Sequence, residues 1–191
     1  MKEARYLIRL GNEARYQPGE IPTLRAALRR LAEPSGGRVR NLRVTPLALE
    51  FDLFLEGDDL DPFFRAWAPL GEKLTAKRLD GAPVRREFAR VLEEARALFN
   101  EERFWEVHEA LEDPWRAASG ETKAWLQGLI LAAAALVHFQ KDEAGVGWRM
   151  MEDAIGRLEK APTRCPSWDL AGLRLHYKDA LSRRKMTAWK A

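Results

Sequence analysis

The chain has 191 residues, of which 46% are hydrophobic and 32% are charged, and its formal net charge is +3. This composition excludes a disordered chain, and the length suits one large domain or two small ones. No apolar run reaches the roughly 18 residues that a membrane-spanning helix needs, and the N-terminus lacks a signal-peptide core, so we expect a cytoplasmic protein without a membrane partner. The single cysteine, Cys165, excludes an intramolecular disulfide.

Residues 1–82 are predicted to form an α+β accessory domain with the element order β-α-β-β-α-β. Strands are expected at residues 4–10, 38–45, 48–56 and 73–79. Helices are expected at residues 22–33 and 59–70, each with a proline near its first turn. This order predicts a ferredoxin-like sandwich, with both helices on one face of the sheet. The turn-forming residues 80–83 mark the end of this domain.

The sheet face without helices is expected to carry charged side chains that pair across neighbouring strands. These are Arg5, Arg9, Arg43, Glu50, Asp52, Lys73 and Lys77. RNA-recognition domains of the same topology place aromatic residues on that face, so nucleic acid is the less favoured partner. Arg25, Arg29 and Arg30 in the first helix remain candidate contacts for an anion or a nucleic acid.

Residues 83–191 are predicted to form an all-α bundle, because apolar residues recur there with helical period. Helices are expected at residues 86–99, 101–116, 121–140, 143–160 and 168–184. The third is apolar almost all round, which is typical of a helix at the centre of a bundle. Its exceptions, Gln127 and His138, are eleven residues apart and lie within about 20° of each other on the helix wheel. Each would cost about 1–3 kcal/mol if buried without a partner.

The helix at residues 101–116 offers partners for these two side chains. Its apolar stripe runs through His108, and Glu112 follows one turn later, within reach of a shared ligand. Glu109 and Glu106 are expected on the adjacent, more exposed flank. We therefore predict a cluster of His108, Glu109, Glu112, Gln127 and His138 in the interior of the bundle.

Three hypotheses remain open for this cluster. Imidazole nitrogen and carboxylate oxygen suit a divalent metal such as zinc, iron or manganese, with His108, Glu112 and His138 as ligands. A carboxylate beside a histidine also suits acid–base chemistry. The third hypothesis is a hydrogen-bonded network that only specifies the core, which is the commoner fate of such groups. The second histidine of the metalloprotease HExxH motif is missing.

Residues 90–160 resemble the family catalogued as domain of unknown function 309. The shared pattern is an FN pair, a helix with aromatic-E-x-H-E-x-x-E-x-x-W spacing, a QG helix with a later histidine, and a turn before the last helix. The matching residues are Phe99, Asn100, Glu106, His108, Glu109, Glu112, Trp115, Gln127, Gly128, Leu129, Ile130 and His138. Leu131 departs from the pattern, because a second glutamine is common there. The resemblance implies an all-α bundle and brings no established activity.

Taken together, these observations favour a helical domain that binds a metal or a small ligand, or whose polar cluster is purely structural. The first alternative is a metal-dependent hydrolase-like enzyme that uses His108, His138 and Glu112. The second is an adaptor that binds nucleic acid or protein through the basic N-terminal domain. The sequence leaves open whether a divalent metal is the cofactor and whether the chain forms a homo-oligomer.

Overall fold

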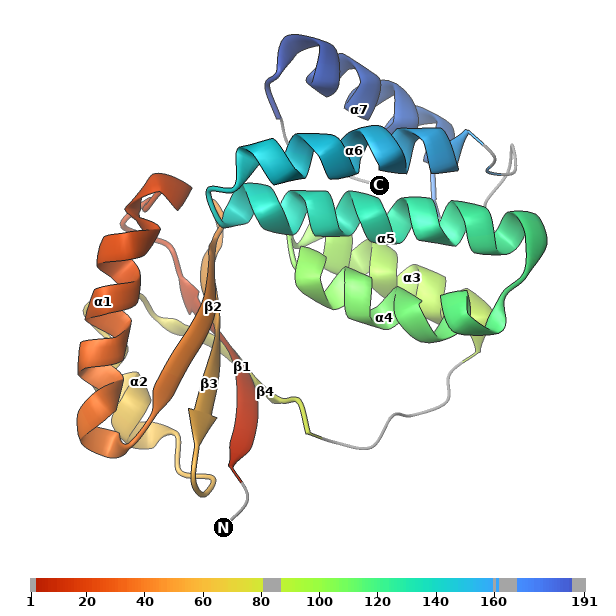
Figure 1. Ribbon diagram of the computed structural model, residues 1–191. Coiled ribbons are helices and arrows are strands. Elements are labelled where there is room, and N and C mark those ends of the chain that lie inside the picture. Colours follow the sequence, from red (N-terminus) through yellow and green to blue (C-terminus); the bar gives the residue numbers. More distant parts are fainter. Residues whose placement is uncertain (1–2, 81–86, 160, 162–167, 187–191) are drawn as a thin grey trace. The chain divides into compact units, whose positions relative to one another are not determined.

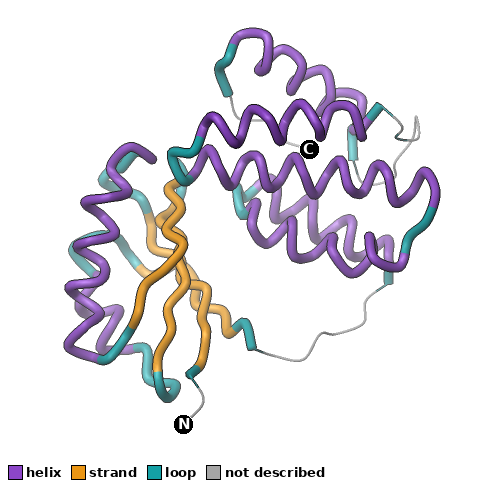
Figure 2. Tube along the Cα trace, in the orientation of Figure 1, coloured by secondary structure: helices purple, strands orange, loops and turns teal. Residues whose placement is uncertain are grey.

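The chain folds into an α+β structure with one antiparallel sheet and a set of helices (Figures 1 and 2). This computed structural model describes residues 3–80, 87–159, 161 and 168–186. The predicted α+β class is confirmed. Two compact units, residues 1–84 with 140–142 and residues 85–139 with 143–191, are described separately. Cys165 lies outside the described residues.

The N-terminal unit contains a four-stranded sheet and two α-helices on one of its faces. The strand order is β2-β3-β1-β4, and each neighbouring pair is antiparallel. In chain order the elements are β1 (Ala4–Gly11), α1 (Ile21–Ala32), β2 (Arg38–Val44), β3 (Ala48–Leu55), α2 (Asp61–Trp67) and β4 (Lys73–Arg78). Two short 3₁₀ turns, Pro18–Glu20 and Glu33–Ser35, flank α1.

Apolar and polar residues alternate along the strands, and the apolar ones form the core of this unit. Tyr6, Ile8 and Leu10 of β1 face the same side as Leu49, Phe51 and Leu53 of β3, and all six are buried. Leu28 and Trp67 come from the two helices to cover them. The Trp67 indole packs edge-on to Phe51 with ring centroids 4.9 Å apart, and its Nε1 donates to the Leu28 carbonyl at 3.2 Å. The indole therefore joins sheet and helix without leaving its polar atom unsatisfied.

The opposite side of the sheet carries ion pairs between neighbouring strands. Arg43 Nε donates to Glu50 Oε1 at 2.7 Å, and Arg5 Nη2 donates to Asp52 Oδ2 at 2.8 Å. Lys73 was expected on this face, and that prediction is wrong. A register shift between Arg9 and Leu10 brings Lys73 opposite Leu10, and the Lys73 ammonium lies 4.3 Å from the Phe64 ring of α2.

The second unit is helical and has its own core. Its helices are α3 (Phe88–Asn100), α4 (Phe104–Ala117), α5 (Gly120–Gln140), α6 (Ala144–Leu158) and α7 (Leu170–Arg183), at the places expected from the sequence. Helix α5 lies between α6 on one side and α3 and α4 on the other, and α7 packs on α6 (Figure 1). Leu111, Leu126, Ala133, Met151 and Leu173 are completely buried where these helices meet.

Helix α5 is long and apolar enough to cross a membrane, by length and composition alone. The sequence holds no unbroken apolar run of that length, because polar residues such as Gln127 interrupt the pattern of α5. Core helices of water-soluble bundles pass the same test, and half of the apolar window of α5 is buried inside the structure. Leu126, Leu129 and Ile130 contribute to that buried surface.

The Tyr177 hydroxyl of α7 is buried in this core and has no hydrogen-bond partner among the described residues. Burial raises the pKa of this hydroxyl well above its ordinary value. Since an unsatisfied buried donor weakens a fold, Tyr177→Phe is expected to raise the free energy of unfolding by about 1 kcal/mol in thermal denaturation. Tyr6→Phe is the contrasting variant and should lower stability, because the Tyr6 hydroxyl donates to Asp58 at 2.8 Å.

Candidate functional site

Three side chains of α4 bring ligand-type atoms together at one place on the helical unit. Ligand atoms of His108, Glu109 and Glu112 all lie within 4.8 Å of one another. His108 Nδ1 is 3.6 Å from Glu109 Oε1 and 3.7 Å from Glu112 Oε1. The sequence placed these three residues in one cluster, and their i, i+1 and i+4 spacing on a single helix brings them together here.

The His108 ring is held at the edge of the core. Its side chain is 29% exposed, but the Nδ1 atom itself is buried and has no hydrogen-bond partner among the described residues. Val107 and Leu111, its neighbours on α4, are fully buried and fix the orientation of the helix. An imidazole nitrogen thus faces two carboxylates at distances slightly too long for hydrogen bonds.

Glu112 divides its two oxygens between two partners. Oε1 faces His108, whereas Oε2 accepts a hydrogen bond from Arg116 Nη2 one turn later on α4. Arg116 also donates to Asp113 Oδ1 at 3.0 Å. The guanidinium therefore orients the Glu112 carboxylate and leaves one of its oxygens directed at the imidazole.

Glu106 does not lie on an exposed flank, and the prediction that it does is wrong. Its side chain is only 1% exposed, and Oε1 accepts a hydrogen bond from Arg103 Nε at 2.7 Å. Burial lowers the pKa of Arg103, but its hydrogen bonds to Glu106 and Glu101 outweigh this effect and raise the pKa above its ordinary value. Glu106 is thus the buried half of an ion pair at the start of α4.

His138 is placed with a different partner. Its Nδ1 lies 2.5 Å from Glu143 Oε2, across the turn between α5 and α6. His138 is eighteen residues after the start of α5, or about 27 Å along the axis, whereas His108 is about 14 Å from the end of α4. Since a short turn joins these two antiparallel helices, the imidazoles lie at different heights. The sequence analysis did not identify Glu143 as the partner of His138. The only sequence signal for this contact is that α5 ends between the two residues.

Gln127 lies in a cleft of about 660 Å³ on the helical unit. Trp115 of α4 and Leu131 of α5 form part of its walls. Gln127 is half-buried, as is Trp115. The structure therefore brings together three of the five residues in the predicted cluster and places His138 and Gln127 elsewhere in the same unit.

The arginines of α1 are spread over its outer surface. Arg29 and Arg30 are exposed and Arg25 is half-buried. Arg29 Nε donates to the Val39 carbonyl at 3.3 Å, so part of its hydrogen-bonding capacity is used within the N-terminal unit. These side chains remain a candidate contact for anions.

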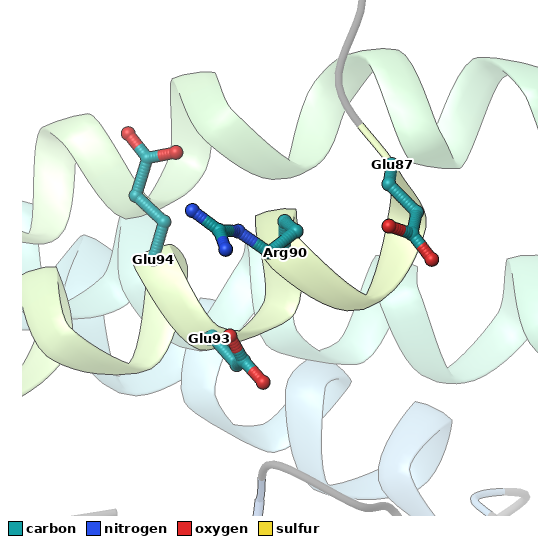
Figure 3. A pocket seen from close by; sticks show the side chains of 4 residues that line it. All are labelled: Glu87, Arg90, Glu93 and Glu94. Carbon is teal, nitrogen blue, oxygen red and sulfur yellow. The ribbon is translucent and has the colours of Figure 1, made fainter.

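A second hollow, of about 700 Å³, lies on the outer face of α3. Figure 3 shows its lining side chains, Glu87, Arg90, Glu93 and Glu94, with Arg90 extending along the helix towards Glu94. Within the described part of the chain all four come from α3 or its N-cap, and all are exposed or half-exposed. Clusters of this kind occur commonly on solvated helix faces, so we do not assign a site there.

Fold and site together define a class: a helical bundle with an imidazole–carboxylate group on the partly exposed face of one helix, joined to an α+β unit. The sequence pattern of the family described as "Domain of unknown function (DUF309)" matches residues 92–150, and the chain belongs to this family through its helical unit. The chain is also similar to a conserved hypothetical protein of known crystal structure from Thermus thermophilus. The two are 37% identical over 47% of this chain and 94% of that one, with a TM-score of 0.42. No curated protein matches the chain.

Proposed function

We propose that the helical unit binds a divalent transition-metal cation through His108, Glu109 and Glu112. The observation that supports this proposal is the buried, unpartnered Nδ1 of His108 beside two carboxylate oxygens. A buried polar atom without a partner is costly, and a cation placed between the three groups would give His108 Nδ1 a partner. Mixed nitrogen and oxygen donors favour zinc, manganese or iron over calcium or magnesium.

The distances are compatible with one shared ion. Two atoms that each lie about 2.1 Å from a zinc ion are at most about 4.2 Å apart. The separations of 3.6 and 3.7 Å from His108 Nδ1 to the two carboxylates fall within this limit. All ligand atoms of the group lie within 4.8 Å of one another. A small rotation of an exposed glutamate side chain would bring the widest pair within reach of the same ion. Three protein ligands would leave further positions for water or a substrate, as in catalytic rather than structural zinc sites.

The competing hypotheses gain less support from the geometry. A hydrolase built on His108, Glu112 and His138 needs both imidazoles at one centre, and His138 is instead paired with Glu143. A purely structural network needs hydrogen bonds, and the contacts of His108 Nδ1 at 3.6 and 3.7 Å are too long.

Metal binding is tested on the untagged full-length chain. We expect stoichiometric uptake of Zn²⁺ or Mn²⁺ in isothermal titration calorimetry, with the metal content checked by elemental analysis. His108→Ala should weaken binding at least about tenfold, since it removes the only nitrogen donor of the group. Glu109→Gln should weaken it as well, because an amide oxygen is a poorer ligand than a carboxylate.

The matched control is His138→Ala, which removes an imidazole from the same unit but not from the group of three. It should leave the affinity unchanged. Equal losses in both histidine variants, or no uptake by the wild-type chain, would rule out this site and leave the polar residues of α4 with a structural role.

For the N-terminal unit we propose a ferredoxin-like sandwich. The element order β1-α1-β2-β3-α2-β4 and the sheet order β4-β1-β3-β2 support this assignment.

An adaptor role for this unit would rest on Arg25, Arg29 and Arg30. Binding of that kind should weaken steeply with salt.

A further inference from the structure

The cleft that contains Gln127 is built by three helices of the same unit. Trp115 comes from α4, Lys123, Gln127 and Leu131 from α5, and Asp153 and Arg157 from α6. The walls therefore combine an aromatic ring and an aliphatic side chain with four polar groups. Binding sites for small molecules typically have this composition, in which apolar walls carry a few convergent polar groups.

Two charged residues of α6 line the cleft without pairing to each other. Asp153 and Arg157 have the i, i+4 spacing at which an acid and a base usually form an ion pair. Within the described residues, no ion pair joins them, and neither side chain makes another hydrogen bond or ion pair. Both are exposed on the cleft side of the helix. A carboxylate and a guanidinium are thus available to a ligand.

The residues of α5 add donors without adding negative charge. Lys123 Nζ lies 4.7 Å from the centre of the Trp115 ring, which holds the ammonium at the wall of the cleft by a cation–π contact. The Gln127 amide is half-buried and makes no hydrogen bond to any of the described residues. Lys123 and Arg157 outnumber the single carboxylate of Asp153, so the polar lining carries a net positive charge.

We propose that this cleft binds a small organic oxyanion, a carboxylate or a phosphate, that also carries an amino group. The Arg157 guanidinium, the Lys123 ammonium and the Gln127 amide bind the oxyanion, because a guanidinium offers paired N–H donors to two oxygens of such a group. Asp153 accepts a hydrogen bond from the amino group of the ligand. The carbon chain of the ligand lies against Trp115 and Leu131. This inference does not depend on the cation site of α4.

Three probes separate the parts of this proposal. Phosphoethanolamine and 4-aminobutanoate carry an amino group four bonds from the phosphorus of a phosphate and from the carbon of a carboxylate, respectively, and ethyl phosphate lacks the amino group. Each is titrated into the ¹⁵N-labelled full chain in EDTA and followed by NMR. We expect saturable shifts centred on Lys123, Gln127 and Arg157 at millimolar concentration for at least one amino-bearing probe, and weaker binding of ethyl phosphate.

Arg157→Gln should weaken binding at least about tenfold, because it removes a charge-assisted donor pair. Arg149→Gln is the matched control, since Arg149 is an exposed arginine of the same helix and does not line the cleft. Asp153→Asn should abolish the preference for amino-bearing probes over ethyl phosphate while leaving the binding of ethyl phosphate intact.

The proposal is overturned if none of the probes shifts signals of the cleft, or if Arg149→Gln weakens binding as much as Arg157→Gln. Because the titrations are done in EDTA, they remain informative if the α4 group binds no metal. A failure here would equally leave the metal titration unaffected.

Discussion

Asp52→Ala is expected to lower the free energy of unfolding of the N-terminal unit by about 3–5 kcal/mol, the usual cost of breaking a buried ion pair from one side. The Asp52 side chain is completely buried, and its Oδ2 accepts hydrogen bonds from Arg5 Nη2 at 2.8 Å and Asn41 Nδ2 at 2.7 Å. Oδ1 lies 3.6 Å from Nη2 of Arg43, which is itself buried. Alanine would remove the negative charge that these groups share.

Urea unfolding followed by circular dichroism measures this loss, and hydrogen exchange of the β1 and β3 amides assigns it to the sheet. Glu3→Ala is the control, because Glu3 pairs with the largely exposed Arg38 at the surface and should contribute far less. If both variants lost the same small amount of unfolding free energy, the buried ion pairs would contribute no more to stability than the surface ion pair.

Gly128→Val is expected to destabilise the helical unit by about 3 kcal/mol, at the upper end of the range for an overpacked core. Gly128 lies in α5 and packs against Leu158 of α6. A Cβ atom at position 128 would lie 2.9 Å from Leu158 Cγ and 3.1 Å from the Leu158 backbone nitrogen. Backbone atoms cannot move away as a flexible side chain can, so the two helices would have to separate.

Gly156→Ala is the matched control in the same helix pair. No heavy atom lies within 4 Å of a Cβ built at position 156, and Gly156 is inside α6. Alanine there should raise stability by up to about 1 kcal/mol, because it favours the helical backbone. Thermal unfolding of both variants measures these changes in stability. A Gly128→Val protein as stable as the wild type would show that α5 and α6 have room to adjust.

Local patterns in the sequence predicted the α+β class because they are strong in this chain. In β3, apolar Leu49, Phe51 and Leu53 alternate with Glu50 and Asp52, so the two faces of the strand could be separated in advance. The position of Lys73 was mispredicted because a bulge shifts the pairing of β1 and β4, and a bulge here has no glycine or proline to reveal it.

The candidate site shows a similar division between what the sequence reveals and what it hides. Contacts within one helix follow from spacing, which is why the sequence could group His108 with Glu112. His138 lies on the same face of α5 as Gln127 but about 16 Å further along the axis, and a helix wheel omits that distance. The cleft could not be found at all, because Asp153 and Arg157 reach it only through the packing of α6.

The length and composition of α5 also have a consequence for the nascent chain. The apolar side chains of α5 are shielded by α3, α4 and α6 only after these helices have packed. Until α6 has left the ribosome, one flank of α5 has no neighbour, and lipid competes with protein for that surface. Substitutions that separate α5 from α6 are therefore expected to increase proteolysis of the chain during synthesis.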